Sequence, residues 1–348
     1  MSGSLLPHGE GTPALVLCHG AFTSPQGKTA HGLLRFGRIY EVRGVVDREV
    51  AGRSASDVDP DFPDVPVFES VEEALEEVKA EVLLIGAAPP GGRLTEEWRR
   101  EVVAAIKAGL DVVSGLHEFL SEDPEISRLA EERGVKLVDV RRPRRELFRV
   151  ADGSVRDVDA TVVLTMGTDC AVGKMSAALE LRDRLRDMGV EAAFLATGQT
   201  GIMVGAEEGV VVDRMPGDFM AGAVEKLVVD LAEEYEVILV EGQGALSHPA
   251  YSGVALAILH GCWPDAVVLV HDPERERRDG FPRFEVPDPE AEIALIESLS
   301  RAEVVSVALR EYDRELADRL SEEGYIVERL GELSGTARRI EELHRMGR

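Results

Sequence analysis

The sequence predicts an α/β protein of two domains, each built on an open parallel sheet. Short apolar runs of strand length alternate with segments of helical spacing along most of the 348 residues. Two of these runs lead into glycine-rich loops, at residues 20–29 and 167–174, and a helix is predicted directly after each loop. The length also suffices for two hydrophobic cores. We place the domains at residues 1–150 and 151–348.

The first domain is predicted to be Rossmann-like, because its strands and helices follow one another in the order of a parallel sheet with crossover helices. The expected strands are 14–18, 41–46, 65–68, 82–85, 111–114 and 136–140, and the expected helices are 30–35, 71–79 and 96–108. Asp47 follows the second strand, where an acid can bind a ribose hydroxyl. No G-x-G-x-x-G precedes it, so the sequence indicates a nicotinamide cofactor only weakly.

The first glycine loop (residues 20–29) ends in Gly27-Lys28-Thr29. It has six residues between its two glycines, more than a phosphate-binding loop requires, and it is consistent either with a ligand site or with a plain turn. His117 follows the strand 111–114, at the sheet edge where ligands of such folds bind. We treat it as a candidate substrate-binding residue, with structural hydrogen bonding as the alternative.

The second glycine loop (residues 167–174) carries the clearest functional signal. The apolar run 161–165 precedes Gly167, and helical spacing resumes at once after Gly173-Lys174. Strand, glycine loop, lysine and helix form a phosphate-binding arrangement, because backbone N–H groups, a helix N-terminus and an ammonium group converge on one anion. The candidate cofactor-binding residues are Gly167, Thr168, Asp169, Cys170, Ala171, Val172, Gly173, Lys174, Met175 and Ser176.

The spacing departs from the common pattern G-x-x-x-x-G-K-[ST]. That pattern would place a glycine at 168, where Thr168 stands, and a hydroxyl at 175, where Met175 stands. The second domain is nevertheless predicted to be a parallel sheet of the P-loop NTPase type, with strands at 192–195, 236–240, 265–270 and 304–309. Glu241 ends one of these strands, where P-loop proteins hold magnesium or relay to it.

Residue scarcity points to further candidates. The chain has no asparagine and only three glutamines, all beside glycines in regions predicted to be loops: Gln26, Gln199 and Gln243. Gln199 and Thr200 lie in a turn rich in hydrogen-bond donors after the strand 192–195, and Gln243 follows Glu241. We therefore interpret Gln199, Thr200 and Gln243 as candidate substrate-binding residues.

Composition limits the possible partners. The net charge of −26 opposes nonspecific binding to nucleic acid or to an anionic membrane. No apolar run is long enough to span a membrane and no secretory signal is evident, so we expect a cytoplasmic protein that acts on a small molecule. Three distant cysteines favour neither a disulfide framework nor a zinc site. Few amides and many Arg and Glu residues suggest a thermophile, and we expect a homo-oligomer.

The motifs resemble known families. The loop 167–174 looks like that of dethiobiotin synthetases, as does the strand end Val240-Glu241-Gly242-Gln243-Gly244. Across nearly the whole chain the motifs resemble a conserved two-domain family, a Rossmann-like domain followed by a P-loop domain, long catalogued as a domain of unknown function. The residues that carry this resemblance are 27–30, 90–94, 114–118, 167–174, 197–201, 218–219, 241–244, 248–249 and 259–261.

Some members of that family are described as D-glutamate N-acetyltransferases, which use acetyl-CoA in D-amino-acid metabolism. The resemblance therefore implies N-acetyl transfer from acetyl-CoA to a D-glutamate-type amino acid. The chain departs from its relatives at Ala245, where a hydroxyl residue is usual, and at Ala308-Leu309-Arg310, where small polar residues are usual. The residues of the second glycine loop by themselves indicate only phosphate binding.

Three hypotheses follow for the chemistry. In the first, an acyltransferase, Glu241 or His248 takes a proton from the attacking amine. In the second, an ATP-dependent ligase or kinase, Mg²⁺ is held by Ser176 or Thr168 together with Glu241. In the third, the chain is a nucleotide-binding regulator without turnover.

Overall fold

The computed structural model describes residues 5–87 and 92–347. The chain divides into two compact units. The first comprises residues up to Arg142 together with Gln199–Gly205, and the second comprises Pro143–Gly198 and Ala206–Arg348. The segment 199–205 thus belongs to the first unit, although it lies between two strands of the second in the sequence. Part of the predicted loop after the strand 82–85, residues 88–91, lies outside the described residues.

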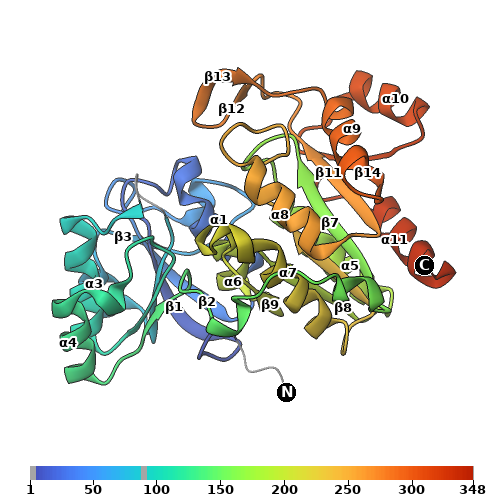
Figure 1. The fold of residues 1–348 in the computed structure, drawn as a ribbon. Coiled ribbons are helices and arrows are strands. Elements are labelled where there is room, and N and C mark those ends of the chain that lie inside the picture. Colours follow the sequence, from blue (N-terminus) through green and yellow to red (C-terminus); the bar gives the residue numbers. More distant parts are fainter. Residues whose placement is uncertain (1–4, 88–91, 348) are drawn as a thin grey trace. The chain divides into compact units, whose positions relative to one another are not determined.

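The first unit has a parallel sheet in the order β3-β2-β1-β4-β5-β6, with its elements running from blue to green in Figure 1. This is the strand order of a Rossmann-type fold, as predicted. The elements are β1 Thr12–Leu17, α1 Lys28–Phe36, β2 Tyr40–Val46, β3 Val67–Phe68, α2 Val71–Glu77, β4 Val82–Ile85, α3 Glu96–Ala108, β5 Asp111–Ser114, α4 Pro124–Arg133, β6 Leu137–Asp139 and α6 Gln199–Val204.

Two helices of this unit were not expected from the sequence. Helix α4 begins at Pro124 because the Asp123 side chain accepts hydrogen bonds from the N–H groups of Glu125 and Ile126, and it ends at Gly134 in a left-handed conformation. The turn expected around Gln199 is instead the start of the short helix α6, which packs against α1. Gln199 therefore lies on a helix and not in a loop.

The second unit has a larger parallel sheet in the order β15-β14-β11-β7-β10-β8-β9. Its elements are β7 Thr161–Gly167, α5 Lys174–Asp187, β8 Ala192–Ala196, β9 Glu208–Gly209, α7 Gly217–Leu231, β10 Val237–Glu241, α8 Ser252–Cys262, β11 Ala266–His271, β12 Arg277–Arg278, β13 Phe281–Glu285, α9 Pro289–Leu299, β14 Glu303–Leu309, α10 Arg314–Glu322, β15 Ile326–Arg329 and α11 Ser334–Met346.

The middle of this sheet positions the second glycine loop. Strands β7, β10 and β11 are fully buried, which explains their nearly continuous apolar sequences. Strand β7 pairs in parallel with β10 on one side and with β11 on the other, and β11 pairs with β14 (β7, β11 and β14 are labelled in Figure 1). The loops that follow these four strands consequently emerge at the same edge of the sheet.

No helix among the described residues is both long and apolar enough to cross a membrane.

Candidate functional site

The second glycine loop lies between β7 and α5, and its backbone adopts unusual conformations. Ala171 has a φ of +53° and Gly173 a φ of +113°, both in the left-handed region. A side chain at Gly173 would also stand 2.6 Å from the Leu330 side chain, so the position requires glycine. Strained backbone of this kind is concentrated at ligand sites. Helix α5, of 14 residues, begins at Lys174, so the loop leads directly into the N-terminus of a helix.

The carbonyl groups of the loop are held by cations. Four consecutive backbone carbonyls each accept a hydrogen bond from a cationic side chain: Thr168 from Arg278 at 3.1 Å, Asp169 from Lys174 at 2.6 Å, Cys170 from Arg275 at 2.6 Å and Ala171 from Arg310 at 2.9 Å. In a planar trans peptide the N–H points opposite to the carbonyl. Each N–H that follows one of these carbonyls therefore points away from the cation that holds that carbonyl.

Lys174 is the lysine of this arrangement, and its side chain lies within the structure. The residue is 7% exposed, and its Nζ donates to the Asp169 carbonyl. Its ammonium group thus lies at the loop and not in bulk water. The position fits the predicted role of a counter-charge for a bound phosphate.

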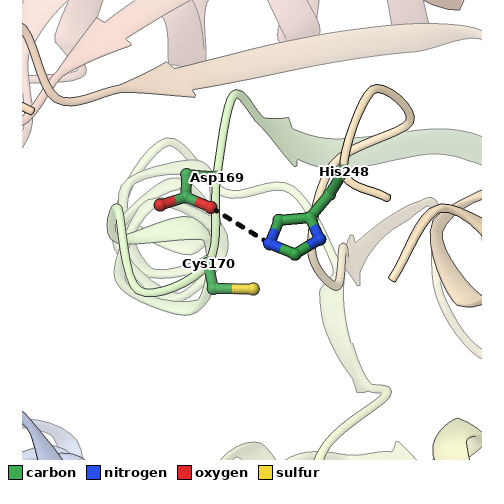
Figure 2. Close-up of side chains that lie close together, drawn as sticks. All are labelled: Asp169, Cys170 and His248. Carbon is green, nitrogen blue, oxygen red and sulfur yellow. Dashed lines mark ion pairs between the residues drawn. The ribbon is translucent and has the colours of Figure 1, made fainter. Parts of the chain in front are cut away.

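Asp169 is a fully buried carboxylate inside the loop. Its Oδ2 accepts hydrogen bonds from Arg275 at 3.2 Å and from the Asp279 N–H at 2.8 Å. Its Oδ1 has no hydrogen-bond partner among the described residues, and it lies 3.7 Å from His248 Nε2 and 3.9 Å from Arg278 Nη1. Figure 2 shows the carboxylate and the imidazole facing each other, with the Cys170 side chain beside them.

His248, a predicted catalytic residue, is fully buried next to this carboxylate. Its Nδ1 accepts a hydrogen bond from the Ala250 N–H at 3.1 Å, so in the neutral ring the proton resides on Nε2. Burial lowers the pKa of His248 below its usual value of 6.5, and the nearby Arg278 and Lys174 lower it further, against the opposing effect of Asp169. A neutral His248 therefore presents an N–H donor at Nε2.

Asp169, Cys170 and His248 bring one oxygen, one sulfur and one ring nitrogen within 4.8 Å of one another, as Figure 2 shows. Such a group could hold a transition metal. Metal-bound histidines, however, donate an N–H from the second ring nitrogen to an acceptor, whereas Nδ1 of His248 is itself an acceptor. The arginines around Asp169 also oppose a cation. The geometry therefore fits an anion better than a metal ion.

Glu241, the other predicted catalytic residue, ends strand β10 and is 6% exposed. Its Oε2 accepts hydrogen bonds from the N–H groups of Thr197 at 3.0 Å and Gly198 at 3.2 Å, which fixes the chain after β8 against the end of β10. Gln243 donates from Nε2 to Thr197 Oγ1 at 3.1 Å. Glu241 and Gln243 are thus brought together in the second unit, as their closeness in the sequence suggests.

The remaining predicted substrate-binding residues, His117, Gln199 and Thr200, lie in the first unit. Thr200 Oγ1 hydrogen-bonds Thr29 Oγ1 at 2.8 Å, which connects α6 to the N-terminus of α1. Gln199 is buried, and its Oε1 has no hydrogen-bond partner among the described residues. This oxygen lies so close to Gly115 that a side chain there would collide with it.

The predicted magnesium ligands are partly engaged by other groups of the protein. Met175 stands where a hydroxyl would bind the ion, and a thioether is a poor ligand for Mg²⁺. Glu241 uses Oε2 for two backbone N–H groups. Thr168 Oγ1 is paired with His271 Nδ1 at 2.8 Å. Ser176, the other predicted ligand, lies one residue beyond Met175 in the first turn of α5, so magnesium binding at Ser176 and Glu241 stays a prediction, and no step below is derived through it.

Sequence reasoning missed the three arginines that hold the loop. Arg275 and Arg278 follow β11, and Arg310 follows β14. Each lies more than a hundred residues along the sequence from the loop carbonyl to which it donates. The available signal was the basic run at 275–278 directly after a buried strand. Arg310 was noted only as a departure from the resembled family, and it proves to contact the loop.

The fold and this site define a class of protein: a two-domain α/β protein with a Rossmann-like N-terminal domain and a P-loop C-terminal domain. Residues 149–335 match the family model of the P-loop domain of a domain of unknown function, DUF1611, and residues 48–143 match the Rossmann-like domain of the same family. The chain belongs to the DUF1611 family.

A solved structure and two curated proteins are similar to this chain. The crystal structure of a DUF1611 family protein from Anabaena variabilis has a TM-score of 0.88 at 33% identity, covering 95% of this chain and 100% of that one. Proteins named D-glutamate N-acetyltransferase are 42% identical over 222 residues in Tritonibacter scottomollicae and 38% identical over 216 residues in a Pseudoalteromonas species. These matches span 63% and 62% of this chain, and 65% and 64% of the relatives' lengths.

Proposed function

We propose that this protein transfers an acetyl group from acetyl-CoA to the amine of a small D-glutamate-type amino acid. The observation that carries the proposal is the second glycine loop, whose four consecutive carbonyls are held by cations directly before the N-terminus of helix α5. Such a loop suits the phosphate groups of coenzyme A. The names of the two curated relatives supply the acceptor.

In the proposed reaction the amine attacks the thioester carbonyl, the carbon–sulfur bond to coenzyme A breaks, and the amine loses a proton. Aminolysis requires a base for this proton and donors for the developing oxyanion. We assign the base to Glu241, because it is a carboxylate. We assign a donor role to His248, because its Nε2 carries the proton when the ring is neutral. Gln243, which lies beside Glu241 in the second unit, is the proposed contact to the amino acid.

The proposal is tested by incubating the full chain with D-glutamate and acetyl-CoA and measuring release of the coenzyme A thiol and formation of the N-acetyl product. We expect both to appear in a one-to-one ratio, with L-glutamate as a poorer acceptor. Parallel reactions with ATP and Mg²⁺ measure phosphate release. Phosphate release without acetyl transfer would replace the proposal by a ligase or kinase, and binding of both cofactors without any turnover would indicate a regulator.

A further inference from the structure

The cations around the second glycine loop bear on how its ligand is bound. Three arginines and Lys174 bring four positive charges to four consecutive carbonyls. Asp169 and Asp272 are the carboxylates paired with Arg275, and Asp272 also lies 3.8 Å from Arg310. Cations therefore outnumber these carboxylates by four to two. Before any ligand binds, these six groups together therefore carry a net positive charge.

This net positive charge can take over two roles of a metal ion. A magnesium ion in a nucleotide site neutralises phosphate charge and fixes the phosphate relative to the protein. Arginines neutralise phosphate charge as well, and they are permanently protonated at any pH at which the protein is folded. The position after Lys174, where the common pattern has a magnesium-binding hydroxyl, is Met175, and the next hydroxyl in the sequence is that of Ser176. Asp169 Oδ2 accepts a hydrogen bond from Arg275.

The arginines also prepare the loop for its ligand. Arg278 is 5% exposed, and its second terminal nitrogen is anchored to Ser247, with 2.8 Å between Nη2 and Oγ. Arg275 links the Cys170 carbonyl to the Asp169 carboxylate through one guanidinium nitrogen. Because these hydrogen bonds hold the carbonyls, the peptide planes of the loop are already ordered before the ligand binds. Less conformational entropy is then lost on binding.

We infer that the second glycine loop binds its phosphate ligand without a divalent cation, and that Arg275, Arg278 and Arg310 are the positioning residues that replace the metal. This inference rests on the proposed function only in taking the loop as the phosphate site. It restricts the ligand to phosphate esters that occur free of magnesium, such as the diphosphate and 3′-phosphate of a coenzyme A thioester, in preference to Mg²⁺–ATP.

The experiment is calorimetric titration of the full chain with coenzyme A, and separately with ATP, in EDTA and in excess Mg²⁺. We expect coenzyme A to bind with the same Kd in both buffers. Arg275→Gln and Arg310→Gln should each weaken this binding about tenfold, because each removes one positive charge beside the loop and one hydrogen bond that orders a loop carbonyl before the ligand binds. Arg310 has a side chain that is 48% exposed, so this second variant tests the idea where folding is at little risk.

Arg277→Gln is the matched control. Arg277 lies within the same basic run, but its side chain is 52% exposed and pairs with Glu285 at 3.0 Å instead of the loop. It should leave the Kd unchanged. Amide hydrogen exchange over residues 168–173 should quicken in Arg275→Gln and not in Arg277→Gln, which separates loss of loop order from loss of net charge.

The outcomes are distinguishable. Binding of either ligand only in the presence of Mg²⁺ would overturn the inference and leave the loop as a phosphate site. Equal weakening in Arg277→Gln and Arg275→Gln would overturn the role of the arginines, since net charge alone would explain it. If coenzyme A, ATP and pyrophosphate all failed to bind in either buffer, the proposed function itself would fall.

Discussion

The two glycine loops of this chain have similar connections but different hydrogen-bond partners. Each follows a central strand of a parallel sheet and leads into a helix that starts with a lysine, Lys28 in α1 and Lys174 in α5. In the first loop, the N–H groups of Gly20 and Phe22 donate to the Asp47 carboxylate at 3.0 and 3.1 Å. A carboxylate of the protein thus occupies the place of an anion.

In the second loop cations hold the carbonyls, and the one carboxylate inside it, Asp169, is itself held by Arg275 and by the Asp279 N–H. Asp47 also accepts a bond from the Glu49 N–H, so both of its oxygens accept hydrogen bonds from backbone N–H groups of the protein. Similar glycine loops thus differ in the groups that hold them: a carboxylate accepts from N–H groups of the first loop, and cations donate to the carbonyls of the second.

The largest expected effect concerns chemistry in the second unit. Glu241→Gln keeps the size of the side chain and an oxygen for the Thr197 N–H, but removes the proposed base. We expect acetyl-transfer turnover to fall by about 10²- to 10⁴-fold with little change in the Kd for coenzyme A.

His248→Ala should likewise lower turnover more than affinity. Steady-state kinetics and calorimetry check both, and equal losses in turnover and affinity would make these residues structural.

The next effect separates the two lysines. Lys174→Ala should weaken the binding of the phosphate ligand by about 1.5–3 kcal/mol, which is roughly 10- to 150-fold in Kd. Lys28→Ala is the matched variant in the first loop, where the side chain is exposed, and it should change the Kd by less than about twofold. Titration with coenzyme A measures both. An unchanged Kd for Lys174→Ala would remove this lysine from the site.

A comparable effect on stability is expected at the first loop. Asp47 is 1% exposed, and Asp47→Asn removes the charge that three backbone N–H groups share. We expect the free energy of unfolding to fall by about 1–3 kcal/mol, measured by urea denaturation. Added sulfate should then stabilise this variant more than the parent chain, because the anion position is no longer charged. The exposed Asp61→Asn should show neither change, and equal responses to sulfate would argue against the comparison.

The smallest expected effect is on pH dependence. Burial lowers the pKa of His248 and of His271 below 6.5 in the folded chain. Between the folded and the unfolded pKa, the unfolded chain binds more protons, so stability is lost as pH falls through about 6.5. Unfolding midpoints at pH 8, 7, 6 and 5.5 should show this loss. His271→Gln should flatten the profile, and a parent profile that is already flat would contradict the expectation.

Much of the fold could be predicted from the sequence, because each buried parallel strand is a short apolar run in the sequence. Strand β4, strand β5 and helix α3 have the bounds that the pattern indicates. Helix α6 was missed because Gln199-Thr200-Gly201 has turn-like composition, and packing on α1 decides its helical state. Helix α4 was missed although its Asp-Pro start and its glycine end were visible in the sequence.

The candidate site was only partly visible. Gly167, Gly173 and Lys174 could be found because a phosphate loop is local in sequence. Arg275 and Arg310 could not be found in the same way, since they lie 105 and 139 residues from the carbonyls they contact. The pairing of β7 with β11, and of β11 with β14, brings them there.

The sequence by itself determined that this protein has two parallel sheets and two glycine loops, because strand length, glycine and lysine are local properties of the chain. Only the tertiary structure decided which groups hold each loop. The groups that fill or hold each loop, Asp47 for the first and Arg275, Arg278 and Arg310 for the second, reach it from the ends of neighbouring strands. Which strands become neighbours depends on the packing of the whole sheet.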